Sequence, residues 1–109
     1  MITIDDFKKL EIKIGSILSA EKVPETDKLL KLSVNFGEDS GPRQIISGIS
    51  AFFQDPRVLV GKKCAFATNL EPRTIKGLES QGMILAVSGE NFFSLLETSL
   101  NVPPGSMVK

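Results

Sequence analysis

The stretch Thr68–Met83, with the sequence TNLEPRTIKGLESQGM, lies between two short apolar runs and decides how the rest of the chain folds around it. The flanking runs, Cys64–Ala67 and Met83–Val87, are apolar throughout, which predicts two buried strands. Between them, Pro72 removes a backbone donor and fixes φ, so the strand ladder is not expected to continue. The sequence therefore predicts a presented loop that leaves the sheet between two strands.

The side chains of this loop suit phosphate, sugar and base edges better than bond-breaking chemistry. Arg73 and Lys76 offer charged donors, while Asn69, Ser80 and Gln81 offer short neutral hydrogen-bonding groups. The alternative is a solvated surface connection with incidental charge, which is the commoner case for a loop considered alone.

Length and charge limit the kind of protein this can be. A chain of 109 residues fits one domain, 1–109, with its own core. Its 13 Lys and Arg residues balance 13 Asp and Glu residues, so a polyanionic partner would have to bind a local patch. The one cysteine, Cys64, excludes an internal disulfide and, within an apolar run, is expected to be buried, which suits a reducing compartment.

Catalytic, metal and membrane functions are disfavoured. The chain has no histidine, and its carboxylates show no clustered metal-ligand spacing, so we expect no catalytic residue, metal or other cofactor. No apolar run approaches the roughly 20 residues that cross a membrane. The early Asp5 and Asp6 do not fit a secretory signal. We therefore expect a cytoplasmic protein without membrane attachment.

The start of the chain predicts a helical turn followed by a bent strand. Thr3, with Asp6 three residues later, resembles the capping arrangement of one helical turn. Apolar alternation then runs to Ile14 and resumes at Ile17 with the opposite parity, as a one-residue bulge at Gly15 would produce. Such a bend would let a short sheet curl into a small barrel, and simple irregularity is the equal alternative.

The clearest periodic signal is Leu30–Phe36, where apolar and polar residues alternate as in a half-buried strand. Lys31 would stand on its outer face, and Lys28 at its entrance. The alternative is that these lysines keep a surface strand soluble. Residues 37–42 predict a hairpin loop, and residues 43–49 predict the returning third strand.

Residues 50–60 lose the alternation and predict a short helix or irregular cap over one end of a barrel. Three strands, a cap and two more strands follow the order of an OB-fold, an all-β, five-stranded Greek-key barrel. We expect the barrel over about 11–88 and a C-terminal extension of short strands over about 89–109, from the same topology.

Apolar side chains in the extension predict a homodimer interface. The alternative is that the tail folds over its own barrel. These residues are Phe92, Phe93, Leu95, Leu96 and Val102.

Short motifs run along nearly the whole chain in a fixed order and spacing. They are Asp6-Phe7, Ile14-Gly15, Asp27–Leu32, Arg43-Gln44, Ser47–Ile49, Leu59–Lys62, Asn69–Arg73, Ser80–Met83, Leu95-Leu96 and Pro104-Gly105. With them the chain resembles the tRNA-binding OB domain found at the C-terminus of methionyl-tRNA synthetases and in free-standing homodimeric tRNA-binding proteins. One such tetrapeptide would be weak evidence for a family, but this many motifs in the same order and spacing are specific. The chain departs at Glu11–Gly15, where the family usually has an aspartate and an arginine, and at Phe52-Phe53, where tyrosine is common.

The resemblance implies a non-catalytic module that grips tRNA by its shape, near the outer corner of the folded molecule. Its partners would be tRNA, a second copy of the chain, and the catalytic part of methionyl-tRNA synthetase. The module would either be appended to that enzyme or act as its separate beta subunit. Met83 matches the family motif, although an apolar residue entering a strand is more often in the core. The expected tRNA-binding residues are Lys28, Lys31, Arg43, Ser47, Asn69, Arg73, Lys76, Ser80 and Met83.

Export-related chaperones of the same fold family, which bind polypeptide, are the competing class. They typically lack the Lys-Leu-Leu-Lys-Leu strand and the Ser-x-Gly-Met motif, and this chain has both, at Lys28–Leu32 and Ser80–Met83. RNA binding is therefore the preferred prediction. Since Trp and Tyr are absent, phosphate contacts should dominate, with Phe the one aromatic residue available for stacking.

Overall fold

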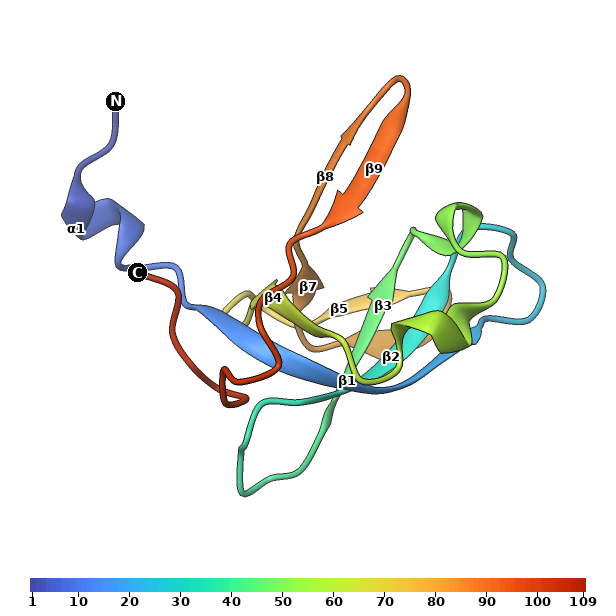
Figure 1. The fold of residues 1–109 in the computed structure, drawn as a ribbon, viewed down its shortest axis with the longest axis horizontal. Helices are drawn as coiled ribbons and strands as arrows, with labels where there is room; N and C mark the ends of the chain where they lie inside the picture. The colour runs from blue at the N-terminus through green and yellow to red at the C-terminus, as the bar shows by residue number, and fades with distance from the viewer.

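Five strands form an antiparallel sheet that curls into a nearly closed barrel in the computed structural model, which describes residues 1–109 (Figure 1). The order across the sheet is β3-β2-β1-β4-β7. The bounds are Ile12–Lys22 for β1, Leu30–Asn35 for β2, Arg43–Ser47 for β3, Lys63–Ala67 for β4 and Met83–Ile84 for β7. The predicted five-stranded OB-like barrel is confirmed.

Short elements surround the barrel. They are α1 (Ile4–Phe7), the 3-10 helices η1 (Ser50–Phe52) and η2 (Pro56–Leu59), and the strands β5 (Arg73–Ile75), β6 (Leu78–Ser80), β8 (Ala86–Gly89) and β9 (Phe92–Leu95). At α1, Thr3 and Asp6 each accept a hydrogen bond from the other's backbone N–H at 3.2 Å, which confirms the predicted cap. None of the helices has the length and apolar character needed to span a membrane.

The long strand β1 links the two sides of the barrel. Its residues 12–16 pair with β4 and its residues 16–22 pair with β2. The register with β2 shifts between Ile17 and Ser19, so the bulge lies at Leu18, and its predicted position at Gly15 is wrong. Gly15 instead packs into the barrel, where a Cβ atom would lie 2.5 Å from Val34 Cγ1. The glycine allows two strands to pack closely and does not itself bend the strand.

Alternating side chains fill the barrel. Leu30, Leu32 and Val34 from β2 are fully buried against Ile45 of β3 and Phe66 of β4. Burying each such side chain contributes about 1.5–3 kcal/mol. The strand predicted from alternation is confirmed, and its polar positions face outward.

Cys64 belongs to the same core. It is fully buried, and burial raises the pKa of its thiol to about 11. The thiol is therefore protonated at neutral pH and acts as a small core side chain.

Residues 68–82 leave the main sheet between β4 and β7, as predicted for a presented loop, and they form a hairpin. β5 pairs with β6 across a two-residue turn, Lys76-Gly77, whose φ angles are 51° and 79°. Positive φ at both central residues matches the right-handed twist of a hairpin. The side-chain amide of Gln44 on β3 donates to the carbonyl of Glu79 at 2.9 Å, and the backbone N–H of Gln81 donates to the carbonyl of Gln44 at 2.8 Å. The hairpin is thus fixed against β3.

Residues 86–109 fold in two different ways. β8 and β9 form a hairpin that projects from the barrel (Figure 1). The chain then returns to β1, where Gly105 N–H donates to Ile14 O at 2.7 Å and Ile14 N–H donates to Ser106 O at 2.9 Å. Val108 N–H donates to Ile12 O at 2.8 Å. The tail thereby covers the part of the β1 edge that β2 leaves unpaired.

Candidate nucleic-acid interface

Lysines gather where the tip of the β5–β6 hairpin meets the outer face of β2 and the end of β1. Lys76, at the tip, lines an open groove of about 380 Å³ with Lys31 of β2 and Lys22 of β1. On the other side of the tip, Lys76 and Lys28 line a second groove of about 370 Å³. We call these four residues the lysine surface. It lies on the strand and loop region that OB-folds use for nucleic acid.

Only one member of the lysine surface is engaged in an ion pair. The Lys31 ammonium lies 3.0 Å from a carboxylate oxygen of Glu21, its direct neighbour across the strands. No carboxylate lies within ion-pair distance of Lys22, Lys28 or Lys76. An exposed pair of this kind contributes little to stability, and the other three ammonium groups, of Lys22, Lys28 and Lys76, remain open to an anionic ligand.

Arg73 and Met83 lie at the other end of the hairpin. Arg73 is paired with Ser80 at the hairpin base, away from the Lys76 tip. Both Arg73 and Met83 line a small hollow, and the Met83 side chain is 45% exposed. Met83 therefore does not lie in the core, which was the alternative considered for it.

Arg43 is engaged in contacts within the chain. Its guanidinium donates to both carboxylate oxygens of Glu38, at 2.8 and 2.7 Å. Nη1 also donates to the carbonyls of Thr68 at 2.6 Å and Gln81 at 3.1 Å. Since these carbonyls lie near the two ends of the 68–83 stretch, Arg43 closes the base of the hairpin. The Arg43 guanidinium also lowers the pKa of the Glu38 carboxyl from its ordinary value.

Ser80 and Asn69 make similar internal contacts. The Ser80 hydroxyl is buried and accepts a hydrogen bond from Ile46 N–H at 3.0 Å. The Asn69 side chain accepts from Glu11 N–H at 2.8 Å and donates to the carbonyl of Lys9 at 2.7 Å. These two side chains therefore hold the hairpin to β3 and to the segment before β1.

Sequence reasoning missed two residues of this region. Lys22 lines the groove beside Lys31, but nothing near it in the sequence distinguishes it from other surface lysines. Gln44 belongs to the Arg43-Gln44 motif, but its role as the anchor of the hairpin on β3 has no local signal, since its partner Glu79 lies far along the chain. Ser47 was singled out, and it lies half-buried at the end of β3 opposite Leu30.

We expect Ser80→Ala to lower the free energy of unfolding by about 1–3 kcal/mol, because it leaves the Ile46 N–H without its acceptor beneath the hairpin. The Ser80 hydroxyl also donates to Gly82 O at 2.9 Å, and that contact is lost too. Thermal unfolding followed by circular dichroism measures the change. Ser88→Ala, at an exposed position on β8, is the matched control and should leave the midpoint unchanged. Equal midpoints for the two variants would contradict the anchoring role.

The barrel and the lysine surface place the chain in the class of small OB-like domains whose β2–β3 face and adjoining loops carry the ligand site. The family model described as "Putative tRNA binding domain" matches residues 12–107. The chain belongs to this tRNA-binding domain family, and the resemblance read from its motifs is confirmed.

Relatives of known name agree with this assignment. The chain is 51% identical over 108 residues to a methionine–tRNA ligase of Methanospirillum hungatei, covering 99% of the chain and 16% of the ligase. The chain thus spans about 16% of the length of the curated relatives it matches.

Two solved structures share the whole fold. One is a MetRS-related protein from Pyrococcus horikoshii, with a TM-score of 0.92 and 37% identity, covering 100% of this chain and 98% of that one. The other is the chaperone CsaA from Bacillus anthracis, with a TM-score of 0.86 and 25% identity, covering 100% and 99%. The barrel therefore occurs both in a MetRS-related protein and in a protein named as a chaperone.

Proposed function

We propose that this chain is a non-catalytic tRNA-binding module that acts with methionyl-tRNA synthetase, either appended to it or as a separate beta subunit. The observation that carries the proposal is the position of Lys76 between two grooves, with Lys31 beside one and Lys28 beside the other. A phosphate backbone crossing the face of β1 and β2 would meet a cation on each side of the hairpin tip. Phosphate contacts of this kind fix the orientation of an RNA without reading its sequence.

Binding in this proposal depends on a surface formed before the RNA arrives. Arg43, Ser80 and Asn69 hold the hairpin by hydrogen bonds within the chain, which reduces the entropy lost when Lys76 meets a phosphate. Arg73 and Met83 at the hairpin base extend the contact along the RNA. Shape, rather than base sequence, would then select the ligand.

The catalytic part of methionyl-tRNA synthetase is the proposed protein partner, and the cytoplasm is the proposed location. Similarity to a part of methionine–tRNA ligases supports the catalytic part of that enzyme as a partner. Such a module would bring tRNA to the synthetase, and the work would take place in the cytoplasm. The chemistry of aminoacylation would belong to the partner.

A peptide-binding chaperone is the second candidate, because the likeness to CsaA covers the whole chain. The two candidates are separated by filter binding of total tRNA at low salt and by suppression of aggregation of an unfolded test protein. The tRNA module predicts salt-sensitive retention of tRNA and no suppression of aggregation. Suppression without tRNA retention would favour the chaperone and overturn the main proposal.

We also propose that the chain forms a homodimer through the β8–β9 hairpin. The register divides the hairpin into two faces: Phe93 and Leu95 turn toward the barrel, and Val87 and Phe92 lie on the opposite face. Leu95 joins the core, and the Phe93 ring stacks on Phe52 at 4.0 Å between centroids. Leu96, after β9, is also exposed, so three apolar side chains, those of Val87, Phe92 and Leu96, remain uncovered and could meet a partner.

Sedimentation velocity at micromolar concentration should report a dimer. Val87→Asp, which places a charge on the outer face of the hairpin, should weaken the dimer by at least about tenfold, since an unpaired charge is costly to bury. Val58→Asp on η2 is the matched control, because both valines are about half exposed. A monomeric wild-type chain with a protease-resistant hairpin would contradict the proposal.

A further inference from the structure

A carboxylate lies among the cations of the lysine surface. Glu21 lines the same groove as Lys22, Lys31 and Lys76, and one of its oxygens lies 3.0 Å from the Lys31 ammonium. The Glu21 side chain is 63% exposed and the Lys31 side chain 39% exposed. The pair is therefore at the surface that RNA would approach, not beneath it.

We infer that Glu21 limits the affinity of this surface for RNA by holding Lys31 in an ion pair that an incoming phosphate must displace. The inference rests on the proposed function and identifies a residue that opposes it. A carboxylate and a phosphate oxygen compete for the same ammonium donors. The carboxylate that is displaced then stays in the groove and repels the phosphate that replaced it.

Glu21 differs in this respect from the other carboxylates near the lysine surface. Glu25 and Asp27 line the second groove, but neither lies within ion-pair distance of a lysine. Glu21 alone is fixed opposite a member of the lysine surface by strand pairing, so its position does not depend on a flexible turn. Its removal should free Lys31 without disturbing the backbone, because an exposed pair contributes little to stability.

The decisive variant is Glu21→Gln, with Glu97→Gln as the matched control. Glu97 makes a very similar ion pair with Lys62, at 3.1 Å and with side chains 44% and 35% exposed. Lys62 directly precedes β4, which pairs along the edge of β1 opposite to β2, and neither Lys62 nor Glu97 lines either groove. Both variants change the net charge by one unit and remove one surface pair, and they differ only in place.

Binding of fluorescently labelled total tRNA is measured by anisotropy over a series of salt concentrations. Glu21→Gln should tighten binding by about 2- to 5-fold at low salt, because an incoming phosphate no longer has to displace an exposed ion pair at Lys31. The plot of log affinity against log salt should also steepen, by at most about 0.9 units. Glu97→Gln should change affinity less than about twofold, since neither Glu97 nor its partner Lys62 lines either groove.

A second background tests whether Glu21 acts through Lys31. In a Lys31→Ala chain, adding Glu21→Gln should tighten binding by less than about twofold, because the contested ammonium is gone. Equal effects of Glu21→Gln and Glu97→Gln, or an undiminished gain in the Lys31→Ala chain, would overturn the inference while leaving tRNA binding intact. If the wild-type chain does not bind tRNA at low salt, the proposed function fails, and this inference fails with it.

Discussion

Arg43→Ala should destabilise the chain by about 2–4 kcal/mol, because one guanidinium satisfies a carboxylate and two backbone carbonyls that would all lose their donor. The Glu38 carboxylate would be left without its partner, and the base of the hairpin would lose the link between Thr68 and Gln81. Urea denaturation measures the change. Because the hairpin carries Lys76, tRNA binding should weaken as well, even in conditions where the barrel remains folded.

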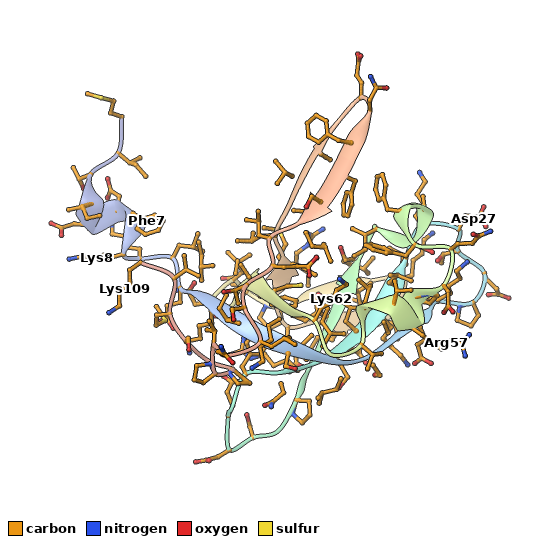
Figure 2. All side chains as sticks on the ribbon, in the orientation of Figure 1. Phe7, Lys8, Asp27, Arg57, Lys62 and Lys109 are labelled. Carbon is orange, nitrogen blue, oxygen red and sulfur yellow. The ribbon has the colours of Figure 1, made fainter.

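Arg57→Ala is the matched control for Arg43→Ala. Arg57 also makes a bidentate pair, with Asp55, but its side chain is 84% exposed and it contacts no distant carbonyl (Figure 2). Its loss should change the free energy of unfolding very little, because water and salt screen a fully exposed pair. Equal losses from the two substitutions would show that Arg43 does not hold the hairpin.

The contribution of Arg43 should also depend on pH. Hydrogen bonding to Arg43 lowers the pKa of Glu38 from its ordinary value of 4.5, so the folded chain binds a proton there less readily than the unfolded chain. The stabilisation is therefore complete above pH 4.5 and is lost as the pH falls through the lowered pKa. The difference in stability between wild type and Arg43→Ala should accordingly shrink on acidification. An unchanged difference would mean that the carboxylate pair contributes nothing.

Removing Lys28, Lys31 and Lys76 together by alanine substitution should nearly abolish tRNA binding. If each contacts a phosphate, the slope of log affinity against log salt should fall by about 2–3 units, and affinity at low salt should fall roughly 100-fold or more. Different tRNAs should be affected alike, because phosphate contacts carry no sequence information. Anisotropy over a salt series gives both quantities.

The control for this variant removes the same charge elsewhere. Lys8, Lys9 and Lys109 are exposed and lie near α1 and the C-terminal tail, at the end of the molecule away from Asp27 and the β1–β2 turn (Figure 2). Their combined replacement should leave the salt slope nearly unchanged. If both triple variants lose affinity equally, binding is a diffuse charge effect and the localised surface is wrong.

The parts of the fold that could be predicted from sequence are those set by neighbouring residues. Alternation in Leu30–Phe36 predicts a half-buried strand because the period of two is a local property. The Thr3 and Asp6 cap depends on residues three apart. The order of the strands along the chain follows from the successive apolar runs. The family motifs then supply the overall topology, which the comparisons support.

The remaining features depend on distant partners. Gly15 predicts a bulge when seen alone, yet its role is to make room for Val34, and only the folded barrel shows that contact. Similarly, Arg43 and Ser80 are polar residues suited to RNA, but the structure directs them to backbone groups far along the chain. Nothing near these residues in sequence distinguishes a side chain that binds a ligand from one that holds the site in place.

Because the C-terminal tail pairs with β1, folding depends on the order in which the two segments are synthesised. β1 leaves the ribosome well before the tail, so the edge at Ile12 and Ile14 stays unpaired until Gly105 and Val108 arrive. An unpaired strand edge can recruit strands of other chains, and the nascent barrel is exposed to such mispairing during this interval. Non-local pairing of this kind slows folding, because the loop between the two segments must close before any contact stabilises it. Amide exchange at Ile14, Gly105 and Val108 would then report the last step in the assembly of the domain.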